Sequence, residues 1–461
     1  MSILGAFIVP HPPIILPEVG KGEERKIQKT IDSYRAVAEK IAALKPETIV
    51  ITSPHSAFYS DYFHISPGSK ASGDLQQFGI HNVQLFAQYD QKFAKELEQT
   101  AINAQIPAGK LGKHNARLDH GTLIPLYFVQ QKYNAFQLVR IGLSGEPLFT
   151  HYQFGKRIAE TAERLNRKTV LIASGDLSHR LKADGPYGFA PEGPEFDRRV
   201  TEAMASGDFL EFFNFSPEFC ERAGECGLRS FVIMAGALDG KSVRSELLSY
   251  EGPFGVGYAV AAFEITGNDE NRHFDQHYRQ TEREKLEQLK AQEDPFVKLA
   301  RASLEHYLSQ RAFLRQPKDL PQEMVTRQAG VFVSLKKNGQ LRGCIGTITP
   351  AMGNIAEEII MNAVSAGMND PRFPPVSREE LADLVYSVDV LSPPEPIHSP
   401  ELLDVKRYGV IISRDYRRGL LLPNLEGVDT VEEQIDIARK KAGIRKDEPY
   451  ELERFEVVRH Q

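Results

Sequence analysis

The chain has 461 residues, of which 41% are hydrophobic and 26% are charged, and its formal net charge is −6. This length predicts two or three domains, each large enough to bury a core of its own. The slightly acidic balance offers no basic surface for nucleic acid. Neither a signal-peptide pattern nor an apolar stretch of membrane-spanning length occurs in the sequence. We therefore expect neither a nucleic-acid partner nor a membrane, and the sequence says nothing about oligomeric state.

The three cysteines, Cys220, Cys226 and Cys344, are an odd number and lack the spacing of a disulfide framework. Structural disulfides persist mainly outside the reducing cytoplasm. We interpret these residues as reduced thiols of a cytoplasmic protein.

Short apolar runs alternate with segments of helical periodicity in the first half of the chain. The elements predicted in chain order are strand 5–9, helix 21–44, strand 48–53, helix 93–104, strand 137–143, helix 153–165 and strand 169–174. Helix 231–238 and strands 242–250 and 257–263 follow. This alternation is typical of an α/β domain with a mostly parallel sheet and helices on both faces.

Residues 268–293 are rich in charged side chains and contain neither glycine nor proline. We predict a solvated helix or linker here. The predicted domains are therefore 1–267 and 294–461. The second mixes helices at 296–309 and 430–442 with strands such as 331–335, and we expect a smaller α+β domain.

Histidines follow the ends of three predicted strands. Prolines at 10 and 12 end the first strand at His11, because proline cannot donate to a sheet ladder. His55 and His179 follow the strands at 48–53 and 169–174, and His120 opens an apolar run. One such histidine is more often a cap or a surface residue. Several at one sheet edge predict a metal site, because neutral imidazole binds iron, zinc and copper.

A third metal ligand remains open between carboxylates and a thiol. Asp119 directly precedes His120, and Asp176 precedes His179 by three residues, where it could orient that imidazole or bind a metal itself. Glu225 precedes a predicted helix, where the helix dipole alone would favour it. Cys226, the next residue, is the softer alternative, since a thiolate binds iron, zinc or copper.

Five motifs together resemble the class III extradiol ring-cleaving dioxygenases of the LigB type and their Memo relatives, over about residues 1–265. They are Val-Pro-His-Pro-Pro at 9–13, Ser-Pro-His at 53–55, Leu-Asp-His-Gly-Thr at 118–122, Ser-Gly-Asp-Leu-Ser-His at 174–179 and Glu-Cys-Gly at 225–227.

The resemblance implies a role for each motif. His11, His55 and Glu225 would bind non-haem iron(II), His179 would be the acid–base residue, and His120 would hydrogen-bond the substrate. The order Glu-Cys-Gly is closer to the Memo branch, in which a cysteine lies at the metal and ring cleavage is not implied.

The second domain contains a predicted hairpin at 330–347 with a turn at Asn338 and Gly339. Its Leu-Arg-Gly-Cys-Ile-Gly-Thr motif at 341–347, with Asp-Pro-Arg-Phe-Pro-Pro at 370–375 and Leu-Leu-Leu-Pro at 420–423, resembles the family of the AMME-syndrome candidate protein (AMMECR). Cys344 would be a nucleophile or covalent carrier supported by Arg342, with Asp370 or Asp389 as further candidates. The alternative is a small buried residue in a tight strand crossing.

Three functions follow from these patterns. The preferred one is an iron(II) oxygenase that cleaves a small catechol-like aromatic substrate with O₂. The second is a metal-binding component, holding iron or copper, of a system resembling AmmeMemoRadiSam, whose radical enzyme would be a separate chain because no CxxxCxxC motif occurs here. The third is a zinc hydrolase. Glu225 as the third ligand favours the first function and Cys226 the second.

Overall fold

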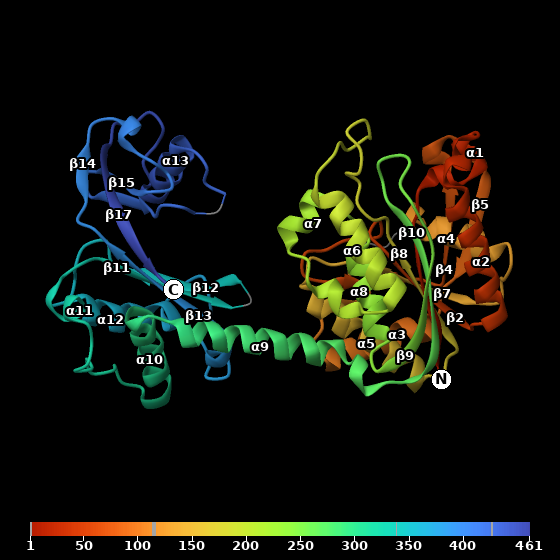
Figure 1. The fold of residues 1–461 in the computed structure, drawn as a ribbon, viewed down its shortest axis with the longest axis horizontal. Helices are drawn as coiled ribbons and strands as arrows, with labels where there is room; N and C mark the ends of the chain where they lie inside the picture. The colour runs from red at the N-terminus through yellow and green to blue at the C-terminus, as the bar shows by residue number, and fades with distance from the viewer. Residues whose placement is uncertain (1, 113–116, 338, 426) are drawn as a thin grey trace. The chain divides into compact units, whose positions relative to one another are not determined.

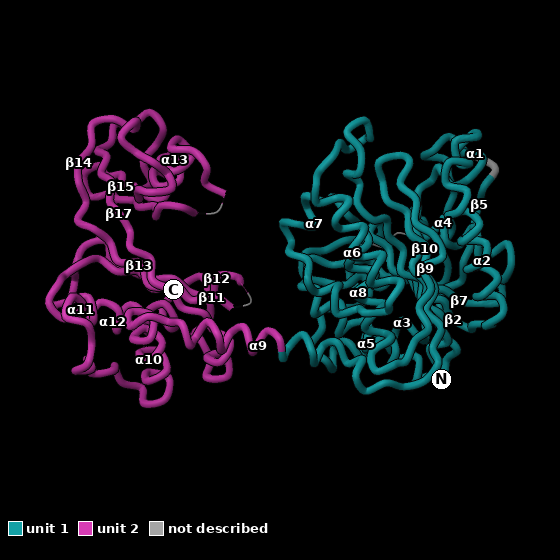
Figure 2. The backbone as a smooth tube through the Cα atoms, in the orientation of Figure 1, with its two compact units in different colours: residues 1–280 teal, residues 281–461 magenta. Residues whose placement is uncertain are grey.

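The computed structural model describes residues 2–112, 117–337, 339–425 and 427–461 (Figure 1). The chain forms two compact units, residues 1–280 and 281–461 (Figure 2). The charged segment 268–293 contains the helix α9 (Phe274–Gln292), and the division between the units falls inside this helix. Among the helices of the described residues, none is long and apolar enough to cross a bilayer.

A six-stranded sheet forms the centre of the first unit, in the order β7-β2-β8-β1-β10-β9. Its strands are β1 (Ile3–Val9), β2 (Thr48–Ser53), β7 (Gln137–Gly142), β8 (Thr169–Ser174), β9 (Lys241–Glu251) and β10 (Tyr258–Asn268). Strands β7, β2, β8 and β1 run parallel, whereas β10 is antiparallel to both β1 and β9. The unit is α/β as predicted, but its sheet is mixed rather than purely parallel, because the hairpin β9–β10 closes one side.

Helices cover both faces of this sheet, and the alternation of side chains along the strands decides which core each residue joins. Phe7 and Val9 pack with α2 (Gln28–Leu44) and α4 (His120–Gln130). Ala6 and Ile8 pack into the opposite core. The helices of that core are α3 (Gln91–Asn103), α5 (Leu148–Arg164), α6 (Glu192–Ser206), α7 (Pro217–Ala223) and α8 (Leu228–Ala237).

Residues between β2 and α4 add small elements that were not predicted from the sequence. They are β3 (Phe63–His64), β4 (Lys70–Leu75), β5 (Ile80–Gln88) and β6 (Ala108–Gly109). The short helix α1 (Pro17–Gly20) follows β1. The predicted strand 5–9 and helix 21–44 correspond to β1 and α2 with shifted ends.

The strand order brings the histidine motifs together. Strand β8 lies between β1 and β2, so the carboxyl ends of these three parallel strands are neighbours in the sheet. Tyr34 of α2 donates a hydrogen bond to the carbonyl oxygen of Pro10, which fixes the chain where β1 ends. The residues after the three strands therefore meet at one edge of the sheet.

The second unit is smaller and is built on a curled antiparallel sheet in the order β12-β11-β13-β17-β15-β16, with β14 paired to β17. Its elements are α10 (Pro295–Gln310), α11 (Gln322–Thr326), β11 (Val331–Lys337), β12 (Gln340–Gly346), α12 (Ile355–Met368), β13 (Leu384–Leu391), β14 (Glu395–Ile397), β15 (Tyr408–Arg414), β16 (Arg417–Leu421), α13 (Val431–Ala442) and β17 (Glu451–His460). The predicted hairpin is β11–β12, and Asn338 of its turn lies outside the described residues.

Helices α5 and α8 approach so closely that each has a glycine at the contact. A Cβ atom at Gly155 would lie 2.0 Å from the carbonyl oxygen of Ile233, and one at Gly236 would lie 2.0 Å from that of Tyr152. Backbone cannot move aside as a flexible side chain can. We expect Gly155→Ala to lower the free energy of unfolding by about 3 kcal/mol, measured by urea denaturation.

Gly267 is the matched control, because the nearest atom to a Cβ there is 4.0 Å away. Gly267→Ala is expected to change stability by less than about 0.5 kcal/mol. Equal stability of the two variants would contradict the close helix contact.

Candidate functional site

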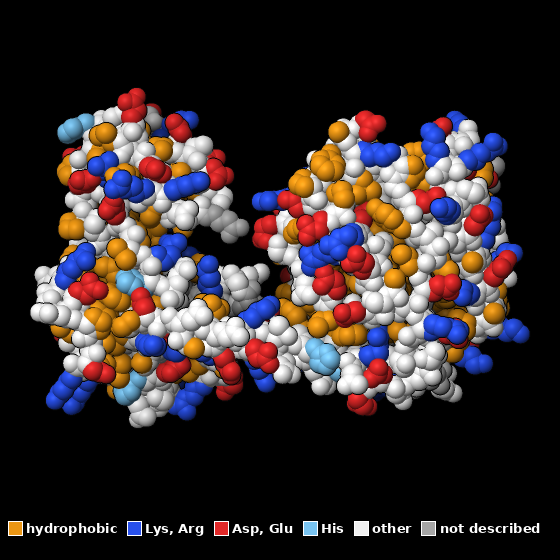
Figure 3. Space-filling view, in the orientation of Figure 1, with side chains coloured by type: hydrophobic (Ala, Val, Ile, Leu, Met, Phe, Trp, Pro, Cys, Tyr) orange, Lys and Arg blue, Asp and Glu red, His pale blue; other side chains and the backbone are white. Residues whose placement is uncertain are grey.

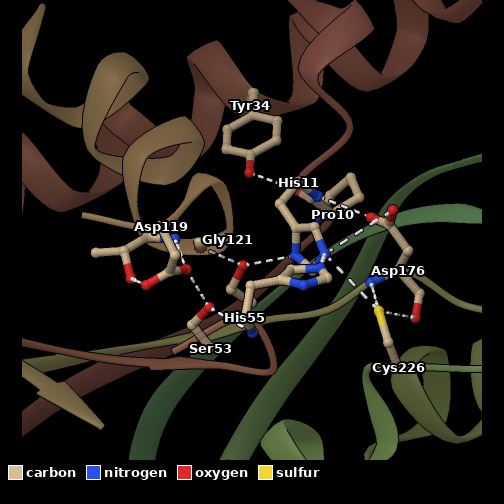
Figure 4. Close-up of polar contacts among 11 residues, drawn as sticks. Pro10, His11, Tyr34, Ser53, His55, Asp119, Gly121, Asp176 and Cys226 are labelled. Carbon is tan, nitrogen blue, oxygen red and sulfur yellow. Dashed lines mark hydrogen bonds and ion pairs between the residues drawn. The ribbon is translucent and has the colours of Figure 1, made fainter. Parts of the chain in front are cut away.

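Two histidines and one cysteine converge at the edge of the sheet where β1, β8 and β2 end (Figure 4). His11 Nε2 lies 3.0 Å from His55 Nε2 and 3.7 Å from Cys226 Sγ. The three ligand atoms all lie within 4.8 Å of one another. Metal–nitrogen bonds of about 2.1 Å place neighbouring ligands of one ion roughly 3 Å apart, so the two imidazoles have the spacing of a shared ligand pair.

The tautomer of His11 is set by Ser174 at the end of β8. The Ser174 hydroxyl donates its single proton to the carbonyl oxygen of Gly121 at 2.6 Å. It must therefore accept from His11 Nδ1, which lies 2.9 Å away. With the proton on Nδ1, the lone pair of His11 is on Nε2, the atom that faces His55 and Cys226. The imidazole is thus held in the form that binds a metal.

His55 is held by a second set of hydrogen bonds. Its backbone N–H donates to Ser53 Oγ at 3.2 Å, and Ser53 Oγ donates to Asp119 Oδ1 at 2.5 Å. Asp119 also accepts from the backbone N–H of Thr122 and so caps the first turn of α4. The carboxylate that caps α4 therefore also fixes the strand end that carries His55.

The ring of His120, the first residue of α4, packs against that of His55 with 3.9 Å between ring centroids and an angle of 31° between the ring planes. Burial, together with His55 and His11, lowers the pKa of His120 to about 3. Burial also lowers the pKa values of His11, His55 and His179. All four imidazoles are consequently neutral at neutral pH, which is the form that binds metals and accepts protons.

His179 approaches the site from the segment after β8. Its ring lies 5.1 Å from that of Tyr187, and its backbone N–H donates to the carbonyl oxygen of Gly224 at 3.3 Å. Its Nε2 atom is buried and has no hydrogen-bond partner among the described residues. A buried nitrogen without a partner is costly unless a ligand supplies one.

Asp176 touches both His11 and Cys226. Its Oδ1 accepts from the backbone N–H of His11 at 2.8 Å, and its backbone N–H donates to Cys226 Sγ at 3.3 Å. Burial raises the pKa of Asp176 to about 6, against the opposing effect of the hydrogen bond from His11. Asp176 thus orients the metal-ligand candidates, and its Oδ2 lies 4.0 Å from His11 Nε2.

The structure separates Glu225 from Cys226, the two candidates for the third ligand. Glu225 Oε2 accepts the backbone N–H of Leu228 at 2.7 Å, at the amino end of α8. Cys226, in the same turn, places its sulfur beside His11. Among the described residues, the group that could hold a metal here contains Cys226 and does not contain Glu225. Glu225 has the helix-capping role that its position alone allows.

Two cavities lie near these side chains. One of about 90 Å³ is lined by His55, Arg117, Asp119 and Arg140. The other, of about 380 Å³, is lined by Phe254 and Tyr258 among other residues. The second cavity is mostly apolar in its lining residues, which include Ile14, Pro186, Pro253 and Val256.

A second group with metal-ligand chemistry occurs near the start of α9. Asp239, His273 and Asp275 lie close together, but Lys156 Nζ stands 2.9 Å from Asp239 and 2.8 Å from Asp275. The ammonium group already fills the place that a cation would take. This cluster is an ion-pair network that ties α5 to the start of α9.

In the second unit, the described contacts of Arg342 are with residues other than Cys344. Its guanidinium binds Glu380 through two bonds of 3.0 Å and donates to the carbonyl oxygen of Pro374. Cys344 instead contacts Ser334, Asp370 and Arg372. No individual role was predicted from the sequence for Arg372 or Ser174. They were noted only as members of the motifs at 370–375 and 174–179.

Comparisons with known proteins divide the chain in the same way. Residues 5–261 match the family described as the catalytic LigB subunit of aromatic ring-opening dioxygenase, and residues 297–460 match the AMMECR1 family. A protein of Clostridium acetobutylicum is 43% identical over 468 aligned residues, covering 100% of this chain and 99% of that protein. A Thermotoga maritima protein is 51% identical over 170 residues, covering 36% of this chain and 98% of its own length. The crystal structure of an uncharacterised protein from Pyrococcus horikoshii matches with 36% identity and a TM-score of 0.34, covering 36% of this chain and 88% of that chain.

The ion pair between Arg342 and Glu380 is expected to make the free energy of unfolding depend on pH in the acidic range. Arg342 lowers the pKa of Glu380 to about 2, from an ordinary value of 4.5. A carboxylate with a lowered pKa stabilises the folded state above its unfolded pKa, and this contribution disappears as the pH falls toward about 2. We expect Glu380→Gln to lower the free energy of unfolding by about 1 kcal/mol at pH 7, and by progressively less below pH 4.5.

Urea denaturation of both proteins between pH 7 and pH 3 measures this difference. A destabilisation that does not change with pH would show that the pair contributes no electrostatic stability. Glu401→Gln, a change of an exposed carboxylate in the same unit, controls for the loss of a surface charge.

Proposed function

The chain belongs to the family of the catalytic LigB subunit of aromatic ring-opening dioxygenases, with an AMMECR1 domain fused to it. We propose on this basis that its first unit holds a redox-active metal ion. The ligands are His11, His55 and Cys226, and the substrate is a small aromatic molecule. The observation that carries this proposal is the convergence of these three ligand atoms from three separate segments.

The donor set fits a metal and selects among metals. Burial raises the pKa of the Cys226 thiol, with the carboxyl groups of Asp176 and Glu225 adding to the rise. A thiol with a raised pKa is most readily deprotonated when a cation replaces its proton. Two imidazoles with one thiolate suit copper or iron(II), and copper gains most from a soft ligand. Zinc also accepts this set, and zinc bound as purified would favour a hydrolase instead.

A redox-active ion held there would supply Lewis acidity and electron exchange with O₂. The chain's own residues handle the protons. His179 is neutral, and its Nε2 is without a partner among the described residues, so it is placed to take a proton from a phenolic hydroxyl. His120, beside His55, offers a further hydrogen bond to the substrate.

Ring cleavage by iron(II) is the second candidate, favoured by the family match over residues 5–261. Both proposals place the metal at the same ligands. They differ in the product, which is ring-opened only in the second. Cys226 at the site, where ring cleavage calls for a carboxylate, favours oxidation without ring opening. In that case the protein would act as one component of a modification system, with a radical enzyme as a separate partner chain.

Substituting each of the two adjacent ligand candidates, Cys226 and Glu225, in separate variants tests the metal site. We expect Cys226→Ser to weaken copper or iron binding by on the order of a hundredfold, because it removes one of three ligands. Glu225→Gln is the matched control, and its affinity should stay within a few-fold of the wild type. Anaerobic reconstitution followed by metal analysis and titration measures both. Loss of metal from Glu225→Gln with retention in Cys226→Ser would reverse the ligand assignment.

Removing the proton acceptor tests the reaction. We expect His179→Gln to bind metal normally but to lose a factor of roughly 10² to 10⁴ in the rate of O₂-dependent catechol oxidation. Oxygen uptake and the absorbance of ring-opened products, recorded together, separate simple oxidation from ring cleavage. His277→Gln, a change on the exposed surface of α9, should leave the rate unchanged. An unaffected rate in His179→Gln would exclude this role for the residue.

A further inference from the structure

One face of the sheet in the second unit carries polar side chains next to its edge strand β12, beside an apolar cluster that includes Phe332 of β11. Val331, Val333 and Leu335 of β11 pack with α10 and α12 on the other face. The residues between them point the opposite way, as alternation in a strand requires. The strand register places Ser334 opposite both Cys344 of β12 and Ser387 of β13. The next row holds Asp389 of β13 opposite Arg459 of β17.

Cys344 is held in place on this face by its backbone. Its N–H donates to Asp370 Oδ2 at 2.9 Å, and its carbonyl oxygen accepts from Arg372 Nη2 at 3.2 Å. These bonds occupy the outer edge of β12, which pairs with β11 on its other side. The Ser334 hydroxyl donates to Cys344 Sγ at 3.2 Å. The thiol is partly exposed; burial raises its pKa above the ordinary value, while the Ser334 hydrogen bond and the Arg372 guanidinium act to lower it.

Two arginines beside the thiol are fixed by buried aspartates. Asp370 is 4% exposed and Asp389 is 3% exposed. Asp370 binds the Nε and Nη2 edge of Arg372, and Asp389 binds the same edge of Arg459. The Nη1 group of each guanidinium makes no hydrogen bond within the described ranges of the chain. Each fixed guanidinium thus keeps donors for a further acceptor.

Lys441 adds a third cation from α13. Its ammonium group reaches the carbonyl oxygen of Leu420 at 3.4 Å. It is close enough to Cys344 and Arg372 for their charges to act on it, the thiol raising its pKa and the guanidinium, with burial, lowering it. The hydrogen bonds to Asp389 raise the pKa of Arg459, and the Cys344 thiol adds to this rise, so Arg459 also lies within electrostatic reach of the thiol. Three cations and two carboxylates leave one net positive charge next to the thiol.

We propose that this polar face is a second ligand site, in which Arg372, Arg459 and Lys441 bind the carboxylate or phosphate of a small molecule beside the Cys344 thiol. Fixed guanidiniums suit such groups because their N–H donors match the paired oxygens of both anions. The space-filling view shows a notch between the part of this unit that carries α13 and the part that carries β12 (Figure 3). A purely structural cysteine requires no surrounding cations. This site is independent of the metal centre proposed for the first unit.

Alkylation of the full-length protein tests the site, with iodoacetate as an anionic probe and iodoacetamide as its neutral counterpart. In both reactions the sulfur–carbon bond forms, the carbon–iodine bond breaks, iodide leaves and the thiol proton goes to water. Peptide mass spectrometry measures the rate at Cys344 separately from Cys220 and Cys226. We expect the iodoacetate-to-iodoacetamide rate ratio at Cys344 to be on the order of tenfold higher in the folded protein than in the urea-unfolded chain.

Neighbouring lysines on α13 give the matched pair of variants. Lys441→Gln should lower the rate ratio several-fold, whereas Lys440→Gln, also exposed, should leave it unchanged. Protection of Cys344 from iodoacetamide by inorganic phosphate or by acetate then distinguishes the two anions. The proposal is overturned if Cys344 reacts with neither reagent in the folded protein. It is equally overturned if the folded and unfolded ratios agree, or if the two lysine variants behave alike.

Discussion

The hydrogen bond from His11 Nδ1 to Ser174 Oγ is the interaction on which the first site depends. Through one hydroxyl group it joins the end of β1 to the end of β8, and the same hydroxyl donates to Gly121 in the first turn of α4. Because the Ser174 proton is already committed to Gly121, the imidazole has a single tautomer available. The element that carries His120 and the strand that carries His11 are therefore positioned by the same side chain.

Burial gives the site a second property, which is that its imidazoles and its thiol are neutral. The imidazoles have lowered pKa values, while burial raises those of Asp176 and Cys226. Desolvation disfavours the charged form of each group, so without a cation the imidazoles and the thiol are neutral at neutral pH. A bound metal ion changes this balance, since its charge stabilises the thiolate and pairs with neutral nitrogen ligands. Metal binding would thus release a proton from Cys226 and none from the neutral imidazoles.

Much of this arrangement could be predicted from local sequence. Prolines after a β-branched run mark the strand ends at His11 and His55, and neighbouring parallel strands bring such ends to one edge. The choice between Glu225 and Cys226 could not be predicted, because adjacent residues in a turn point in different directions and both suit a helix start. The role of Arg459 could not be predicted either, because its partner Asp389 is 70 residues away in the sequence and no local pattern indicates the pair. The mixed character of the sheet depends on the β9–β10 pairing, which sequence periodicity does not determine.

The two partly exposed thiols of the proposed sites differ in what surrounds them, and this difference separates the chemistry of the two units. Cys226 lies among neutral imidazoles and near the carboxyl groups of Asp176 and Glu225, so its surroundings attract a cation. Cys344 lies beside Arg372, with Arg459 and Lys441 near, so its surroundings attract an anion. A site built for a cation cannot double as a site for an anion, because the same charges that favour one repel the other. On these proposals, the fused domains would contribute separate binding functions to one chain.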